Sequence, residues 1–185
     1  MAVYRLRLDS QSYRKVTPLD SAGASLVFAG RSIDDPVAPI RCRFQHRERP
    51  RADFMSFKPG TVVASAKMID DHFAIWEGCE FVALDIEGQA YYAVNVVHVV
   101  NALDRERSCP ASAPLLTAEM TAYVFRPKRL WPPQIFKLPE TSANEILAAS
   151  SPDSDPMDDL VAVCRQAGLT GLKFQRLWVD DPATK

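Results

Sequence analysis

The first pair of side chains with the potential for nucleophilic chemistry is Ser65 and Lys67, in the tripeptide Ser65-Ala66-Lys67. A neighbouring amine can deprotonate a serine hydroxyl, and such a pair would make a small hydrolase. Side chains that share a helix face lie three or four residues apart, so these two do not face each other. We therefore interpret Ser65 as the N-cap of a following helix and expect no catalytic residue, with a small hydrolase as an alternative.

Cysteine and histidine supply a candidate zinc site. Cys42 and His46 lie four residues apart, and His72 and Cys79 follow further along the chain. Zinc ligands usually come in closely spaced pairs, and only one pair here is near that spacing. Cys42 also falls on the apolar side of an alternating segment, which favours burial in a core. The sequence therefore predicts neither a zinc site nor a cofactor.

A carboxylate cluster near the end of the chain could chelate a divalent ion. It consists of Asp153, Asp155, Asp158 and Asp159. Asp155 followed by Pro156 is typical of an N-cap and the first position of a helix. Asp158 and Asp159 then fall in the first helical turn, where the helix dipole favours negative charge. We interpret the cluster as helix-capping rather than metal-binding.

The segment Arg41–Arg51 carries five arginines, with Phe44 and His46 between them. Basic residues interleaved with aromatic ones are typical of nucleic-acid-binding surfaces. Glu48 and Asp53 dilute this charge, and arginines at alternate positions also mark the solvent-facing side of a strand. A nucleic-acid-binding module that uses this segment is therefore an alternative, and we do not expect direct binding of nucleic acid.

An acidic zone lies between Lys67 and Arg105, where the chain has no lysine or arginine. Surfaces of one charge sign attract oppositely charged partners and speed their association. If these acids share one surface, they indicate a basic partner; alternatively, flanking basic segments fold over the zone and neutralise it. We select six acids as candidate contacts with a protein partner: Asp70, Asp71, Glu77, Glu80, Asp85 and Glu87.

Bulk composition indicates a water-soluble globular chain. The 185 residues fit one domain, residues 1–185, and the 47% hydrophobic and 24% charged content is ordinary for such a protein. The net charge of −1 gives no overall attraction to nucleic acid or to a membrane. The alternating start of the chain predicts a strand rather than a signal peptide. We therefore expect a cytoplasmic protein with no membrane partner and with reduced cysteines.

Hydrophobic periodicity predicts a series of strands interrupted by few helices. The predicted strands include Val3–Leu8, Pro39–Gln45, Thr61–Ala64, a hairpin of Phe81–Ile86 with Gln89–Val100, Ala118–Phe125, Ile135–Leu138 and Leu172–Trp178. A helix is expected from Ser65 to about Trp76, with Phe73 on its apolar stripe. Residues Pro139–Asp155 read in part as a loop, and a second helix follows Asp155 and ends at Gly168. Because strands do not alternate regularly with helices, the sequence predicts an α+β fold, a mostly antiparallel sheet with two or three helices.

Four segments of the chain resemble one known family when they are taken together. The central segment runs from Tyr91 to Asp104 and continues through Arg105-Glu106-Arg107-Ser108. The others are Asp53-Phe54 with Ser65-Ala66-Lys67, then Ile135–Pro139, and finally Gly168–Phe174 with Leu177-Trp178. In this order and spacing they are similar to immunity-protein family eleven, and the resemblance is strongest over residues 53–178.

The resemblance implies a non-enzymatic antitoxin from a bacterial polymorphic toxin system. Such a protein binds a toxin made by the same cell, or injected by sister cells through a contact-dependent route such as type VI secretion in interbacterial competition. The shared residues look structural, with Asn95 or Asp104 fixing local backbone. The sequence-based hypothesis is therefore an immunity protein that occludes the active site of a secreted effector. Because the acidic zone suits a basic cleft, we expect that effector to be an enzyme such as a DNase.

Overall fold

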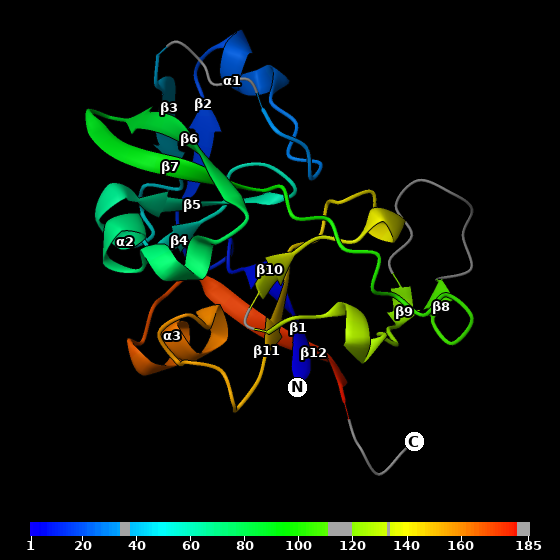
Figure 1. The fold of residues 1–185 in the computed structure, drawn as a ribbon. Helices are drawn as coiled ribbons and strands as arrows, with labels where there is room; N and C mark the ends of the chain where they lie inside the picture. Colours follow the sequence, from blue (N-terminus) through cyan, green and yellow to red (C-terminus); the bar gives the residue numbers. More distant parts are fainter. Residues whose placement is uncertain (34–37, 111–119, 133, 181–185) are drawn as a thin grey trace.

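The computed structural model describes residues 1–33, 38–110, 120–132 and 134–180, and it has the predicted α+β architecture (Figure 1). The described strands form a six-stranded sheet, a four-stranded sheet and a small two-stranded one. Among the paired strands of the described residues, only β3 and β6 run parallel. The prediction of a mostly antiparallel α+β fold is confirmed.

The six-stranded sheet curls until its two edge strands meet. Its order is β2 (Lys15–Pro18), β3 (Ile40–Gln45), β6 (Cys79–Ile86), β7 (Gln89–Val96), β5 (Thr61–Ser65) and β4 (Phe54–Met55). Lys15 of β2 forms a bridge with Ser56, the residue after β4, and the Val16 amide donates a 2.8 Å hydrogen bond to the Ser56 carbonyl. These contacts close the sheet into a small barrel.

Alternation along the barrel strands separates an inner from an outer face. In β3, Ile40, Cys42 and Phe44 are buried, while Arg41 and Arg43 are exposed, as the sequence predicts. The barrel interior is filled by a cluster to which every strand contributes: Val16, Ile40, Cys42, Phe44, Met55, Val63, Val82, Leu84, Ile86, Tyr91 and Ala93. Phe28, from the segment between α1 (Ser21–Ser25) and β3, completes this cluster.

The four-stranded sheet lies beside the barrel. Its order is β10 (Gln134–Phe136), β11 (Leu147–Ser150), β1 (Ala2–Leu8) and β12 (Leu172–Val179), and all of its pairings are antiparallel. Helix α3 (Leu160–Gln166) packs against β11. The small sheet pairs β8 (Cys109–Pro110) with β9 (Met120–Ala122), and the first two residues of the strand predicted over Ala118–Phe125 lie outside the described residues.

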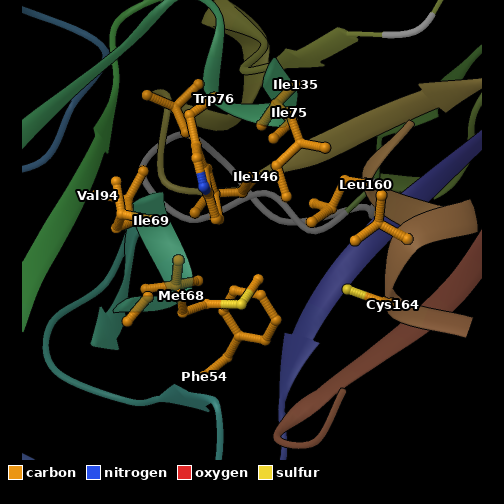
Figure 2. Close-up of a cluster of buried hydrophobic side chains, with 14 residues drawn as sticks. Phe54, Met68, Ile69, Ile75, Trp76, Val94, Ile135, Ile146, Leu160 and Cys164 are labelled. Atoms are coloured by element: carbon orange, nitrogen blue, oxygen red, sulfur yellow. The ribbon is translucent and has the colours of Figure 1, made fainter. Parts of the chain in front are cut away.

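A joint core connects the outer face of the barrel with the four-stranded sheet and α3. Side chains from α2 (Ala66–Asp71), the 3₁₀ helix η1 (Phe73–Trp76), β10 and α3 converge there (Figure 2). Met68 and Ile69 come from α2, and Leu160 and Cys164 come from α3. A third cluster lies on the other side of the four-stranded sheet, around Phe136. Burial of apolar surface in these cores is the main favourable contribution to folding.

The helix predicted from Ser65 to Trp76 is interrupted. Helix α2 ends at Asp71, His72 leaves helical geometry at φ −133° and ψ 41°, and a 3₁₀ turn follows as η1. The change of helix type rotates the later side chains, so Ile75 and Trp76 are buried while Phe73 is 69% exposed. The prediction that Phe73 lies on the buried stripe is therefore wrong.

The second helix starts later than predicted. Asp155 lies in a turn, and Asp159 is the N-cap, whose carboxylate accepts hydrogen bonds from the Val161 and Ala162 amides at 2.8 and 3.1 Å. Met157, which follows Asp155 and Pro156 in this turn, is 58% exposed. A Ser/Asp-rich stretch offers several residues that can cap a helix, and only the position facing the joint core is stabilised by burial.

The loop predicted over part of Pro139–Asp155 contains the inner strand β11. Leu147, Ala148 and Ala149 are all buried, between β10 on one side and β1 on the other. Small side chains such as alanine have low strand propensity, so the sequence pattern does not predict this strand. Its position between two strands and under α3 decides its conformation.

Strand β12 contains a bulge that the sequence alternation does not show. Val3 pairs with Trp178 and Tyr4 with Arg176, which leaves Leu177 without a partner. As a result Phe174 packs against the joint core, and both Leu177 and Trp178 pack against the third cluster. The extra residue moves the apolar side chains from one face of the sheet to the other.

Candidate functional site

Ser65 is the N-cap of α2, as predicted. Its hydroxyl oxygen accepts a 3.2 Å hydrogen bond from the Met68 amide. Lys67 instead pairs with Asp71, four residues later on the helix surface, and this hydrogen bond raises the pKa of the Lys67 amine. An amine with a raised pKa remains protonated and is poorly suited to take a proton from a hydroxyl. The described geometry therefore does not pair Ser65 with Lys67.

The cysteine and histidine residues considered as zinc ligands are separated by the barrel. Cys42 lies inside it, 2% exposed, and burial raises the pKa of its thiol to about 12. His46 is exposed in the turn after β3. Within the part of the chain that the structure describes, no three histidine, cysteine or carboxylate side chains are grouped as metal ligands. Cys42, Cys79 and Cys164 are free thiols, and the side chain of Cys109 lies outside that part.

Three of the five arginines in Arg41–Arg51 have partners within the chain. Arg47 pairs with Glu87, Arg49 donates to the Ser10 carbonyl at 2.8 Å, and Arg51 donates to Gln89 at 2.7 Å. Arg51 also lies over the Phe44 ring, 4.7 Å from its centroid. Arg41 and Arg43 remain exposed on the outer face of β3.

The acids of β6 and its turn do not share one surface. Glu80 lies at the start of β6 and Glu87 in the turn beyond its end. Asp85 is on the opposite face of the strand from Glu80, because the two positions differ by five, an odd number. Asp85 accepts a 2.8 Å hydrogen bond from the Gly88 amide and helps to form the turn. Basic segments neutralise part of the acidic zone, through Arg47 with Glu87 and Lys67 with Asp71.

Glu80 belongs to a polar clasp that holds a plug at one end of the barrel. The plug is residues 26–33, which carry Phe28 into the barrel interior. Four side chains hold it: Lys58 on the Leu26 carbonyl, Lys137 on the Phe28 carbonyl, Asn95 on the Arg31 carbonyl, and Glu80 on the Ser32 hydroxyl and the Ile33 amide. The hydrogen bonds that Glu80 accepts from the Ser32 hydroxyl and the Ile33 amide, together with one from the Asn95 side chain, lower the pKa of Glu80. Asn95 thus fixes the backbone of the plug, 64 residues away in the chain, rather than the local backbone that the resemblance implies.

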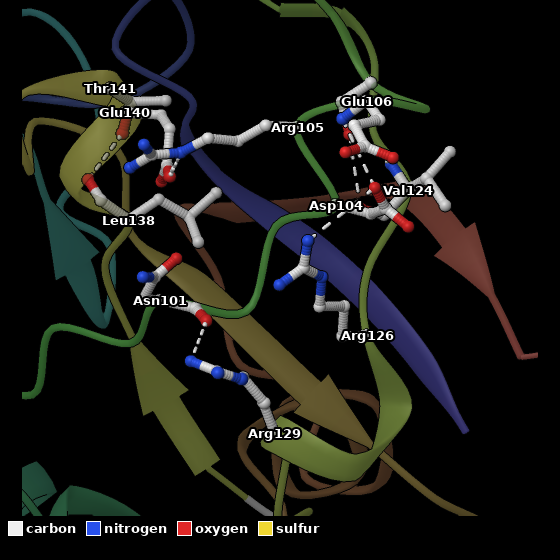
Figure 3. A network of polar contacts seen from close by, with 11 residues as sticks. Asn101, Asp104, Arg105, Glu106, Val124, Arg126, Arg129, Leu138, Glu140 and Thr141 are labelled. Carbon is white, nitrogen blue, oxygen red and sulfur yellow. Dashed lines mark hydrogen bonds and ion pairs between the residues drawn. The ribbon is translucent and has the colours of Figure 1, made fainter.

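Asp104 has a comparable role near the small sheet (Figure 3). Its carboxylate accepts from the Glu106 amide at 3.3 Å and lies 4.0 Å from the Arg126 guanidinium. The neighbouring Arg105 pairs with Glu140 at 2.8 Å and ties this segment to η3 (Pro139–Thr141). The central segment of the resemblance therefore carries structural contacts at both Asn95 and Asp104.

A cleft of about 890 Å³ lies where the barrel meets the four-stranded sheet. Its walls come from η1 and the start of β6 on the barrel side, and from β10, β11 and the start of α3 on the other. Part of its lining, including Trp76 and Ile135, also belongs to the joint core (Figure 2). The cleft is thus an open side of that core.

Two large aromatic side chains in this cleft are exposed to solvent. Phe73 of η1 is 69% exposed, and Trp131, between η2 (Pro127–Arg129) and β10, is 77% exposed. Exposed aromatic residues that line a cleft are typical of binding sites, because aromatic rings contribute strongly to interfaces. Neither residue is among the candidate contacts predicted from the sequence. A signal for Trp131 was its Pro-rich surroundings, which offer no regular strand or helix to bury it.

The cleft also contains a thiol, an imidazole and two carboxylates. Cys79 and His98 line it, but burial raises the pKa of the Cys79 thiol to about 12, so a reactive thiolate is not populated near neutral pH. Glu77 and Asp158 line it as well, and both are exposed. Of the six acids selected from the sequence, only Glu77 lies in this lining. Asp70 and Asp71 are exposed on α2, next to η1 in the chain.

No family model matches this chain, and no curated protein matches it. The resemblance to immunity-protein family eleven therefore stays a prediction. Within the described residues, no helix has both the length and the apolar character needed to cross a membrane.

Proposed function

We propose that this chain is an immunity protein, a non-enzymatic inhibitor that binds a cognate bacterial toxin in the cytoplasm and occludes its active site. The observation that carries the proposal is the cleft with Phe73 and Trp131 on different structural elements, both largely exposed. Exposing two large aromatic rings beside an apolar core has no benefit to an isolated chain in water. A protein that covers them would bury this apolar surface.

The side chains in and around this cleft have the composition that is typical of the centre of a protein–protein interface. Hot spots of protein interfaces are enriched in tryptophan and in other aromatic residues that enter desolvated pockets. Asp70 on α2 and Glu77 directly after η1 add negative charge near this centre, whereas Asp71 is paired with Lys67. They support a basic toxin such as a nuclease. Asp85 and Glu87 make local contacts at the far end of β6 and are less suited to the same interface.

The test is binding and protection by the product of the adjacent gene. We expect that product to co-purify with the chain and to be toxic to cells that lack the chain. Trp131→Ala and Phe73→Ala should each weaken the complex about tenfold or more, because truncating an interface hot spot typically costs about 2 kcal/mol or more. Both variants should keep the parental unfolding free energy within about 0.5 kcal/mol, because the side chains are exposed.

Val27→Ala is the matched control. Val27 is 69% exposed, the same fraction as Phe73, and it does not line this cleft. The control should leave both binding and protection unchanged. The proposal fails if the purified chain has no affinity for the adjacent gene's product and instead turns over a substrate.

Nucleic-acid binding has a narrower basis, the exposed pair Arg41 and Arg43 on β3. It predicts salt-sensitive binding of the isolated chain to DNA or RNA, lost in an Arg41→Ala, Arg43→Ala double variant. Since Arg47, Arg49 and Arg51 have partners within the chain, we favour the protein-binding function.

A further inference from the structure

The cleft has one sign of charge. Glu77, directly after η1, and Asp158, directly before the N-cap of α3, both line it and are exposed. Among the described residues neither carboxylate has a hydrogen-bond or ion-pair partner, and the lining includes no lysine or arginine. The two carboxylates come from segments that are about eighty residues apart in the chain and meet only in the folded molecule.

These carboxylates accompany aromatic rings rather than a purely polar surface. A cation is attracted to the face of an aromatic ring, most strongly to tryptophan, and the attraction grows when the site loses water. Ile75 and Ile135 supply an apolar floor on which the methylene groups of a long basic side chain can pack. Anionic, aromatic and apolar groups thus meet in one cleft.

We infer that the cleft receives an arginine side chain from the surface of the partner protein. The inference rests on the proposed function, because it takes the occupant to be a protein. The guanidinium packs against Trp131 and Phe73 and pairs with Glu77 and Asp158. Arginine suits the cleft better than lysine, because its planar, weakly hydrated group stacks on rings and still donates to carboxylates. A volume of about 890 Å³ also admits the residues flanking that arginine.

A short peptide tests this chemistry directly. The probe is the acetylated, amidated tripeptide Gly-Arg-Gly, titrated to about 10 mM into the labelled protein while the Trp131 indole N–H is followed by NMR. The matched probe replaces arginine with citrulline, which has nearly the same shape and no charge. We expect the arginine peptide to shift the Trp131 signal and to bind about fivefold or more tightly than the citrulline peptide.

Variants of the two carboxylates complete the test. A Glu77→Gln, Asp158→Asn double variant should lower affinity for the arginine peptide about tenfold, and high salt should weaken binding to the parental protein. Glu106→Gln is the control, since Glu106 is exposed, does not line the cleft and is not one of the candidate contacts. Unchanged amide spectra away from the cleft would show that these variants fold.

Equal binding of the arginine and citrulline peptides would overturn the inference, as would the absence of any Trp131 response or an unchanged affinity of the double variant. These results are separate from the test of the proposed function. Loss of the peptide response with co-purification intact overturns only the arginine inference. Peptide binding without co-purification of the adjacent gene's product overturns the inhibitor function.

Discussion

The Lys137 amine donates a 2.6 Å hydrogen bond to the Phe28 carbonyl, and this bond joins the four-stranded sheet to the plug of the barrel. Lys137 follows β10 in the four-stranded sheet, and Phe28 is packed inside the barrel. Lys137 is fully buried, and burial lowers the pKa of its amine from 10.5 to about 8. A charged group at this position therefore destabilises the folded protein, while its hydrogen bond holds the plug.

Lys137→Met should remove a pH dependence of stability. Between about pH 8 and 10.5 the unfolded chain binds a proton at Lys137 that the folded chain has lost, so stability from this group rises with pH. Below about pH 8 both states are protonated and the full penalty is present. From pH 8 to about 9.5, the parental protein should gain about 1.5 kcal/mol relative to the variant, as measured by urea unfolding. Parallel pH curves for both proteins would contradict this.

The clasp residue Asn95 should contribute strongly to stability. Its side chain is fully buried and donates to the Arg31 carbonyl at 2.8 Å and to Glu80 at 3.1 Å. Asn95→Ala leaves both acceptors without this donor and should cost about 2–3 kcal/mol in unfolding free energy. Ser32→Ala removes a more exposed contact with Glu80 and should cost about 0.5 kcal/mol. A similar cost for both variants would argue against a buried clasp.

The two aspartates before α3 should differ in effect. Asp159 is 2% exposed and accepts from two backbone amides as the N-cap, whereas Asp155 accepts one hydrogen bond, from Met157, in an exposed turn. Asp159→Ala should therefore lower the unfolding free energy by about 1–2 kcal/mol, and Asp155→Ala by about 0.5 kcal/mol or less. Thermal unfolding followed by circular dichroism separates the two. The reverse order would place the cap at Asp155.

The two glycines that flank Leu169-Thr170 should respond differently to alanine. Gly168 and Gly171 have φ of +64° and +92°, and a Cβ on Gly168 would have no atom within 4 Å. A Cβ on Gly171 would lie 1.9 Å from the Phe54 carbonyl oxygen. Gly168→Ala should therefore cost about 1 kcal/mol, from backbone conformation alone, while Gly171→Ala should cost more than about 3 kcal/mol. Denaturant unfolding of both variants measures the difference, and equal costs would refute the close approach.

The close approach at Gly171 belongs to a contact between two segments of the resemblance. Asp53 accepts hydrogen bonds from the Thr170 amide and hydroxyl, each at 2.7 Å, and the Phe54 amide donates to the Thr170 carbonyl at 3.1 Å. The other two segments are joined in the same way, since the Lys137 backbone amide donates a 2.9 Å hydrogen bond to the His98 carbonyl. The four segments therefore form structural contacts. Phe73 and Trp131 lie outside these segments, although His98 and Ile135 of the same cleft belong to them.

The local sequence pattern was sufficient to predict the strands in which apolar and polar residues alternate strictly, and to predict the first residue of one helix. β3 shows the predicted inner and outer faces, the hairpin of β6 and β7 forms around Glu87 and Gly88, and Ser65 caps α2. In each case neighbouring residues supply the determining contacts, through side-chain period or a capping hydrogen bond. These elements are enough to predict an α+β fold.

Tertiary structure decided whatever depends on residues far apart in the chain. β11 becomes a strand because β10 and β1 pair with it, and Asp159 rather than Asp155 caps α3 because the joint core buries that turn. Packing also turned Phe73 outward and brought it into the same cleft as Trp131. The candidate site could not be predicted from the sequence. Its aromatic rings and carboxylates come from separate segments, and helix or strand periodicity does not indicate which segments will lie together. Burial and pairing energies depend on which distant surfaces meet, and those surfaces exist only in the folded chain.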